Sequence, residues 1–161
     1  YVILRPTLTY GPTVRGNMDR ILRLSLMRVA PPLAGMRNRR SLLAIENLCD
    51  AVEFGLTSVT ALEQVYLVAD AFPVSIAEIV ENIRKGAGLR GKGLAIPPRL
   101  LSVLVRSCGL GESWEKLGGD LVASVQKLRS HGFRWRIDTA TALQRLGALS
   151  VGKAWTDDSR S

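Results

Sequence analysis

The chain opens with a short apolar run, Val2–Leu4, which predicts a buried β-strand because two of its three residues are β-branched. Pro6 has no N–H to donate to a sheet, so the strand should end near Arg5. The segment Tyr10–Pro12 contains Gly and Pro and is typical of a turn. Ligands of open α/β sheets bind where buried parallel strands end in loops, which makes this stretch the first candidate for a site.

Two later runs, Ser41–Ile45 and Gln64–Ala69, have the length and the apolar character of strands. The predicted helices cover residues 18–28, 46–58, 76–85, 98–108, 112–117, 125–130 and 139–146. Strands that alternate with helices in this way predict an α/β fold, in which helices cover a sheet.

Capping signals mark the starts of four of these helices. Residue types that are preferred as N-caps stand directly before them, namely Asn17, Ser75, Ser124 and Asp138. Glu78 stands three residues after Ser75, so this pair predicts a capping box.

Composition and length fit one domain, which we expect to span residues 1–152 with a polar tail over 153–161. No run of about 18 apolar residues occurs, so no membrane insertion is predicted. No secretory signal is visible, although a first residue other than Met leaves the true amino terminus open. Cys49 and Cys108 form neither a disulfide framework nor a zinc spacing, and we expect reduced, buried thiols in a cytoplasmic protein.

The net charge of +8 suggests nucleic acid as a possible partner. Only Arg37, Arg39 and Arg40 cluster, however, and no base-stacking aromatic residues lie among them. A site for an anionic diphosphate explains this cluster as well as DNA would, and we predict no nucleic-acid partner. His131 precedes a helix-ending Gly132, and no second His or cysteine pair completes a metal site, so no metal is predicted.

The segment Gly86–Gly91 matches G-x-G-x-x-G, the pattern of dinucleotide-binding turns. That function requires a strand before the glycines and a helix after them. Here a predicted helix precedes them, and a loop with a short extended run follows. Glycines that end a helix are therefore the better interpretation.

Two segments carry a resemblance to a known family. Residues Arg5–Pro12 read Arg-Pro-Thr-Leu-Thr-Tyr-Gly-Pro, and Arg40–Ala51 read Arg-Ser-Leu-Leu-Ala-Ile-Glu-Asn-Leu-Cys-Asp-Ala. In their order and separation they resemble two motifs of the extended short-chain dehydrogenases/reductases, the family of UDP-glucose 4-epimerase-like nucleotide-sugar epimerases and dehydratases. The resemblance covers nearly the whole chain but only the carboxyl-terminal part of a family member.

This resemblance implies the last part of a Rossmann-type NAD(P)-binding fold together with the smaller substrate-binding lobe. The strands at 2–5 and 64–69 would belong to the Rossmann-type sheet, and the strand at 41–45 to the lobe. The implied cofactor is NAD, with NADP as an alternative, and the implied substrate is a UDP- or dTDP-sugar that reacts through a transient 4-keto intermediate. The full-length protein would be a homodimer.

The resemblance also assigns roles to single residues. Pro6 and Thr7 match positions that line the nicotinamide. Asn17 matches an Asn that contacts the nucleotide diphosphate of the substrate, and Arg40 matches the Arg that clamps it. A guanidinium group suits that role because it forks onto phosphate oxygens.

Several expected groups are absent from the sequence. The family's glycine-rich NAD turn does not occur, and no tyrosine has a lysine four positions later, so no catalytic residue is assigned. Leu8 stands where many epimerases carry a substrate-binding Asn, Ala44 where His or Tyr is common, and Leu117 where an Arg clamp is expected. We therefore expect these 161 residues alone to hold NAD weakly and to turn over no substrate.

Three interpretations remain open at this point. The chain is part of a nucleotide-sugar epimerase or dehydratase, or of a 4-keto reductase of the same family. It is a basic, helix-rich binding module, for nucleic acid among other ligands. Or it is a non-catalytic interaction domain.

Overall fold

A computed structural model describes residues 1–13, 16–90 and 119–157, with side chains up to Val151. Its elements are, in chain order, β1 (Val2–Pro6), β2 (Leu8–Tyr10), α1 (Asn17–Leu26), β3 (Arg39–Arg40), β4 (Leu42–Ala44), α2 (Ile45–Thr57), the 3-10 turn η1 (Val59–Ala61), β5 (Gln64–Val68), β6 (Val74–Ser75), α3 (Ile76–Gly86), α6 (Gln126–Ser130) and α7 (Thr139–Asp157). The helices predicted over 98–108 and 112–117 lie outside the described residues. None of the described helices is long and apolar enough to cross a membrane.

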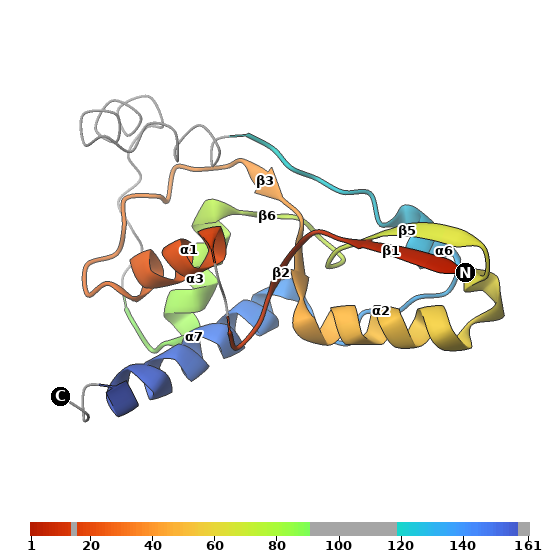
Figure 1. Cartoon of the computed structure of the whole chain (residues 1–161). Helices are drawn as coiled ribbons and strands as arrows, with labels where there is room; N and C mark the ends of the chain where they lie inside the picture. The colour runs from red at the N-terminus through yellow and green to blue at the C-terminus, as the bar shows by residue number, and fades with distance from the viewer. Residues whose placement is uncertain (14–15, 91–118, 158–161) are drawn as a thin grey trace.

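The described strands form three pairs. β1 pairs with β5 and β2 pairs with β4, both in parallel, whereas β3 and β6 are antiparallel. In the first pair, residues 2–6 lie opposite residues 64–68. Parallel neighbours joined through helices are typical of α/β proteins, and the predicted α/β fold is confirmed (Figure 1).

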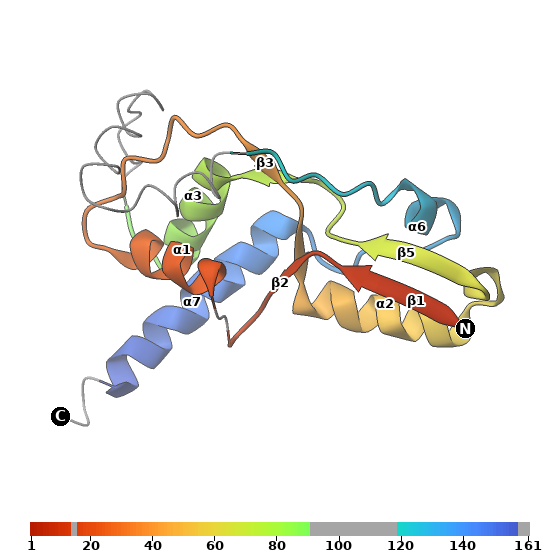
Figure 2. The same ribbon diagram turned by 45° about the horizontal axis from the view of Figure 1, so that its top comes forward.

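β4 lies between two apolar cores. Leu42 and Ala44 belong to the core that α1, α3 and α7 build, whereas Leu43 belongs to the core beneath β1 and β5. All three residues are buried, as expected for a strand covered on both faces. Figures 1 and 2 show the result: α1, α3 and α7 gather on one side of β2 and β4, and β1, β5, α2 and α6 on the other.

α2 covers one face of the β1–β5 pair (Figure 2). Asn47 and Ala51 are its buried residues, and Leu48 and Phe54 pack against the same core. The sequence spaces Leu48, Val52 and Leu56 by four, but Val52 and Leu56 point outward and are exposed. The apolar content of α2 therefore exceeds what its buried face uses.

α3 and α7 approach each other closely because both have glycine at the contact. A Cβ atom added at Gly86 would overlap the backbone carbonyl of Gln144, and one added at Gly147 would overlap the carbonyl of Ile83. Side chains at these two positions would keep the helices apart. The close packing of α3 against α7 thus depends on glycine at positions 86 and 147.

Arg84 of α3 holds the carboxyl end of α1. Its side chain is 3% exposed and donates hydrogen bonds from Nη1 to the carbonyl oxygens of Ser25 (2.8 Å) and Met27 (2.7 Å). The last carbonyls of a helix have no partner within the helix, and a cation also complements their partial negative charge. This buried arginine therefore supplies the hydrogen-bond donors that carbonyls at the carboxyl end of α1 lack within the helix.

Several local predictions are confirmed. Ser75 and Glu78 form the predicted capping box, with Ser75 Oγ accepting from the Glu78 N–H at 3.1 Å and a Glu78 carboxylate oxygen accepting from the Ser75 N–H at 2.6 Å. Asp138 caps α7 by accepting from the Thr141 N–H at 2.9 Å. Gly86 is the last residue of α3, as expected if the glycines of the segment Gly86–Gly91 end a helix instead of forming a dinucleotide-binding turn.

Other local predictions are wrong. The cap position of α1 is Gly16 rather than Asn17, because the helix begins at Asn17 itself, one residue earlier than a cap at Asn17 needs. Val125 rather than Ser124 precedes α6, and neither helix has a side-chain cap. The strand β2 was not predicted, and of the predicted turn Tyr10–Pro12 only Gly11 and Pro12 bend, since Tyr10 still pairs with Ala44 of β4.

Two further differences concern α7 and a cysteine. The last helix runs to Asp157, well past the predicted end at Leu146. Cys49 is exposed rather than buried, because it lies on the outward face of α2. Cys108 falls outside the described residues.

Candidate functional site

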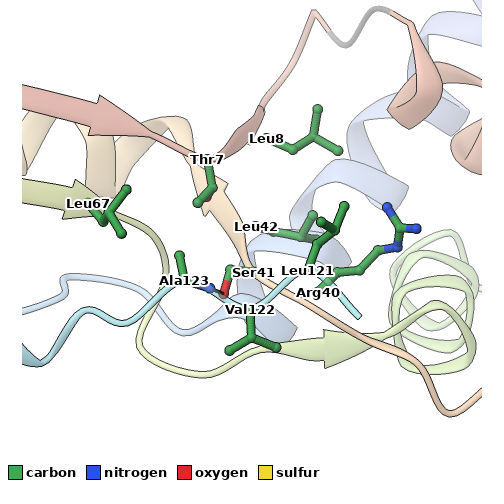
Figure 3. A pocket seen from close by; sticks show the side chains of 9 residues that line it. All are labelled: Thr7, Leu8, Arg40, Ser41, Leu42, Leu67, Leu121, Val122 and Ala123. Atoms are coloured by element: carbon green, nitrogen blue, oxygen red, sulfur yellow. Dashed lines mark hydrogen bonds between the residues drawn. The ribbon is translucent and has the colours of Figure 1, made fainter. Parts of the chain in front are cut away.

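A pocket of about 370 Å³ lies where β1 and β5 end. Its walls come from four segments that are distant in sequence, and Figure 3 shows them converging on one hollow. The lining residues are Thr7, Leu8, Arg40, Ser41, Leu42, Leu67, Leu121, Val122 and Ala123. The carboxyl ends of parallel strands are the common place for ligands in α/β proteins, so this pocket is the candidate site.

Thr7 enters the pocket directly after β1. Its N–H donates to the carbonyl oxygen of Val68 at 3.0 Å, which fixes the end of β1 against β5. The Thr7 hydroxyl oxygen is buried, and within the described part of the chain it has no hydrogen-bond partner. A buried hydroxyl without a partner is costly, so this oxygen is suited to a polar atom of a ligand.

Arg40 forms another wall, and the short strand β3 positions it. β3 pairs with β6, and Leu121 adds a bridge to Arg40 from the other side. The segment around Leu121 is tied down further, because the Ser41 N–H donates to the Leu121 carbonyl at 2.8 Å and Ser41 Oγ accepts from the Ala123 N–H at 3.0 Å. Partial burial lowers the pKa of the Arg40 guanidinium from its ordinary value. A partly desolvated cation binds an anion more strongly than one fully in water.

The other residues singled out in the sequence are arranged differently. Arg40 and Thr7 line the same pocket, but the Arg40 guanidinium extends away from Thr7 (Figure 3). Pro6 ends β1 and is exposed, and Asn17 is exposed at the start of α1; neither lines the pocket. Arg39 donates from Nη2 to the Pro73 carbonyl at 3.1 Å, so its side chain fastens β3 rather than facing the pocket.

A buried polar network is centred on Asp70, just past the end of β5. One carboxylate oxygen accepts from the Ala44 N–H at 3.0 Å and from Asn47 Nδ2 at 2.8 Å. The other accepts from the Tyr10 hydroxyl at 3.0 Å. Burial raises the pKa of Asp70, while these hydrogen bonds act in the opposite direction, and the pKa of the Tyr10 phenol is raised by its own burial and by the nearby Asp70.

Asn47 extends this network to the segment before α7. Its Nδ2 also donates to the Ile137 carbonyl at 2.9 Å, and its Oδ1 accepts from the Ile137 N–H at 3.3 Å. Asp70 and Asn47 together connect β2, β4, α2 and α7. The network thereby fixes β2 and β4, the strands that also supply Leu8 and Leu42 to the pocket.

Sequence reasoning missed Ser41, Leu67 and the segment 121–123 as pocket residues, because only long-range pairing brings them together. Asp70 was also missed, although a signal existed. A charged residue directly after a strongly apolar strand is a candidate for a buried, functional or structural role.

Comparisons with known proteins identify relatives of this architecture. No family model matches the sequence. The UDP-glucose 4-epimerase of Vibrio cholerae is 30% identical over 125 residues, a match that covers 77% of this chain and 38% of that protein. The UDP-glucuronic acid 4-epimerase of Bacillus cereus, solved in complex with NAD, has a TM-score of 0.62 at 14% identity over 95% of this chain and 44% of its own. The GDP-mannoheptose C4 reductase of Campylobacter jejuni, solved with NADP bound, has a TM-score of 0.63 at 12% identity over 94% of this chain and 49% of its own.

The fold is thus that of part of a Rossmann-type α/β protein, and it is shared with a solved 4-epimerase and a solved C4 reductase. The chain spans less than half the length of each of these relatives. It belongs to the extended short-chain dehydrogenase/reductase family, and the resemblance seen in its two sequence motifs is confirmed.

Proposed function

We propose that this chain is the substrate-binding portion of an NAD-dependent nucleotide-sugar epimerase or dehydratase. Its substrate would be a UDP- or dTDP-sugar that reacts through a transient 4-keto intermediate. The 30% identity to a UDP-glucose 4-epimerase, joined to a pocket that combines Thr7 with Arg40, carries this proposal. A 4-keto reductase is the second candidate, favoured by the fold that the chain shares with a solved C4 reductase.

The cofactor inferred is NAD, with NADP as the alternative, because solved proteins of this fold contain one or the other. When bound, the nicotinamide would supply an acceptor and donor of hydride. Thr7 Oγ fits the polar edge of such a ring, since it is buried and lacks a partner among the described residues. Pro6 would present a flat, apolar surface next to it. Most cofactor contacts and the catalytic base would come from outside these 161 residues, which contain neither the family's glycine-rich turn nor its Tyr-x-x-x-Lys pair.

Arg40 would bind the diphosphate of the substrate, and Asn17 would contact the same group. The backbone of Arg40 is held on both sides by Val74 and Leu121, which would fix the position from which its side chain reaches the anion. Leu8, Leu42 and Val122 would pack against the ring bodies of the ligand and exclude water. Water exclusion strengthens the charge-assisted hydrogen bonds of the arginine.

The first test concerns Arg40. In the complete protein to which this chain contributes, Arg40→Ala is expected to weaken UDP-sugar binding by about 1.5–3 kcal/mol, the value of a hydrogen bond to a charged group. Arg40→Lys should also lose affinity, because an ammonium cannot form two parallel hydrogen bonds to phosphate. Isothermal titration calorimetry gives both numbers directly.

Arg37→Ala is the matched control for this test. Arg37 is an exposed arginine three residues away that does not line the pocket, so its loss removes the same charge without the contact. Affinity that falls equally in both variants would indicate general electrostatic attraction. Unchanged affinity in Arg40→Ala would remove this residue from the site.

A second test uses the 161-residue chain by itself. With NAD and UDP-glucose, we expect no formation of UDP-galactose, because no residue of the chain matches the family's base and most of the cofactor contacts are absent. Chromatographic separation of the two sugars measures this, with the Vibrio cholerae relative as the active control. Turnover by the purified chain would overturn the assignment of chemistry to residues outside it.

A further inference from the structure

The two apolar cores of the protein meet at β2 and β4, and the chain passes from one side of these strands to the other. We call α1, β6, α3 and α7, which surround the first core, the α7 half, and β1, α2, β5 and α6 the α2 half. Figures 1 and 2 show the two halves on either side of β2 and β4. The chain passes between them from β4 to α2, from β5 to β6 and from α6 to α7. Whatever holds these passages together determines how the halves are oriented.

The buried network of Asp70 and Asn47 lies at this junction. Asp70, on the passage from β5 to β6, accepts hydrogen bonds from Tyr10 of β2 and from the Thr139 side chain at the start of α7. Asn47, on the passage from β4 to α2, donates to Asp70 and bonds both backbone polar groups of Ile137, on the passage into α7. The four side chains are each at most 6% exposed. Each of the three passages is therefore tied to the same pair of residues.

Hydrogen bonds fix an orientation more sharply than apolar contacts do. Burial of apolar surface is non-directional, whereas a hydrogen bond requires a narrow range of distance and angle. A buried donor or acceptor that loses its partner costs about 1–3 kcal/mol. Because the Tyr10 hydroxyl and the Asn47 amide bind the same Asp70 carboxylate, a change in the angle between the halves would leave several buried groups unpaired at once.

The orientation of the halves matters for the pocket, because both halves supply its walls. Thr7 and Leu67 come from the carboxyl ends of β1 and β5, whereas Arg40 lies on β3, which pairs with β6 of the α7 half. We propose that Asp70 and Asn47 are positioning residues, whose network sets the orientation of the α7 half relative to the α2 half. The separation of Thr7 and Arg40 across the pocket follows from that orientation. Which ligand fits this separation rests on the proposed function, whereas the positioning role itself does not.

Distances between the halves test this role in the whole 161-residue chain. One spin label is attached to Cys49 of α2, which is exposed, and the other to a Leu149→Cys variant of α7, where the native side chain is 51% exposed. A Cys108→Ser background keeps the labelling specific. Double electron–electron resonance should give a single narrow distance distribution in this labelled parent.

Two variants remove links of the network. Asn47→Ala deletes the bonds to Asp70 and Ile137, and Tyr10→Phe deletes one hydroxyl while keeping the ring in its core. Both should lose the single maximum and populate further distances, and Tyr10→Phe decides the matter if circular dichroism shows that Asn47→Ala does not fold. Asp70→Asn should keep the maximum, because its amide oxygen accepts as the carboxylate does and its NH2 donates to hydroxyls that can also accept.

Ile21→Val is the matched control for Tyr10→Phe. Ile21 is a buried residue of α1, and the loss of one methylene costs about 0.5–1.5 kcal/mol, as does the loss of one hydrogen bond. Its distance distribution should stay single, because the network is intact. An unchanged maximum in every folded variant, or equal broadening in Ile21→Val, would overturn the positioning role.

Ligand affinity separates this inference from the proposed function. In the complete protein to which the chain contributes, calorimetry with UDP-glucose should show about tenfold weaker binding in Asn47→Ala if the correct orientation falls to about a tenth of the population. Broadened distances with full affinity would overturn the link between orientation and pocket. Broadened distances with no binding even in the parent would remove the proposed ligand and support the positioning role alone.

Discussion

Replacement of Gly147 by alanine is expected to lower the free energy of unfolding by about 3 kcal/mol, at the upper end of the usual cost of overpacking. The new methyl group would overlap the Ile83 carbonyl, and a backbone atom within a helix cannot move aside as a side chain can. α7 would have to shift along its whole contact with α3. The loss is expected even though alanine favours a helix over glycine by about 1 kcal/mol. Denaturant unfolding followed by circular dichroism measures the change.

Gly55→Ala is the matched control because Gly55 also lies in a helix. There a Cβ would meet Val2 Cγ1 at 3.4 Å, an ordinary van der Waals contact. This variant should be as stable as the parent or more stable, by up to about 1 kcal/mol. If both variants were stabilised alike, the close approach of α3 and α7 would not be a feature of the folded protein.

Removal of the Asp70 carboxylate should be as harmful. Asp70→Ala leaves the Tyr10 hydroxyl and the Ala44 N–H without their acceptor in a buried region, and we expect a loss of about 3 kcal/mol. For a domain of this size that lowers the melting temperature by roughly 6–12 °C. Asp19→Ala is the control, since its ion pair with Arg23 is exposed and surface pairs contribute at most about 1 kcal/mol. Equal losses in the two variants would show that Asp70 has no special part in holding the fold.

The same residue predicts a pH dependence. Burial raises the pKa of Asp70, so the folded chain keeps this proton to a higher pH than the unfolded chain does. The resulting contribution to stability is fully present below the pKa of the unfolded chain, and it is lost as the pH rises through the folded value.

Asp70→Asn removes that titration and keeps a carbonyl oxygen for Ala44 and Asn47. Its stability relative to the parent should therefore rise as the pH rises above about 4, the ordinary pKa of an unfolded Asp. If the difference in unfolding free energy between Asp70→Asn and the parent stayed constant as the pH rises, the direction of the Asp70 pKa shift would be contradicted.

Local signals in the sequence explain which elements were predictable. The strands at Val2, Ser41 and Gln64 stand out as apolar runs, and the capping box at Ser75 is a pattern within four residues. The motif around Arg40 was also recognisable, and it brings Arg40 to the same pocket as Thr7.

What the sequence could not specify depends on residues far apart in the chain. β2 exists because Leu42–Ala44 lie beside it, and the pocket wall at 121–123 exists because Arg39 and Ser41 hydrogen-bond to Leu121. The direction in which Val52 and Leu56 point was also hidden, since both faces of α2 are apolar. Periodicity reveals an apolar face but not which neighbour covers it.

The pairing of β1 with β5 has a consequence for how the protein is made. The partner of residues 2–6 is residues 64–68, and α1, β4 and α2 are all synthesised between them. At about 5–20 residues per second, β1 waits roughly 3–12 s for its partner to be translated. During that interval an apolar strand is free to pair with the wrong segment. Prompt formation of α2, whose helical hydrogen bonds are local, would then let it cover β1 before the correct strand arrives.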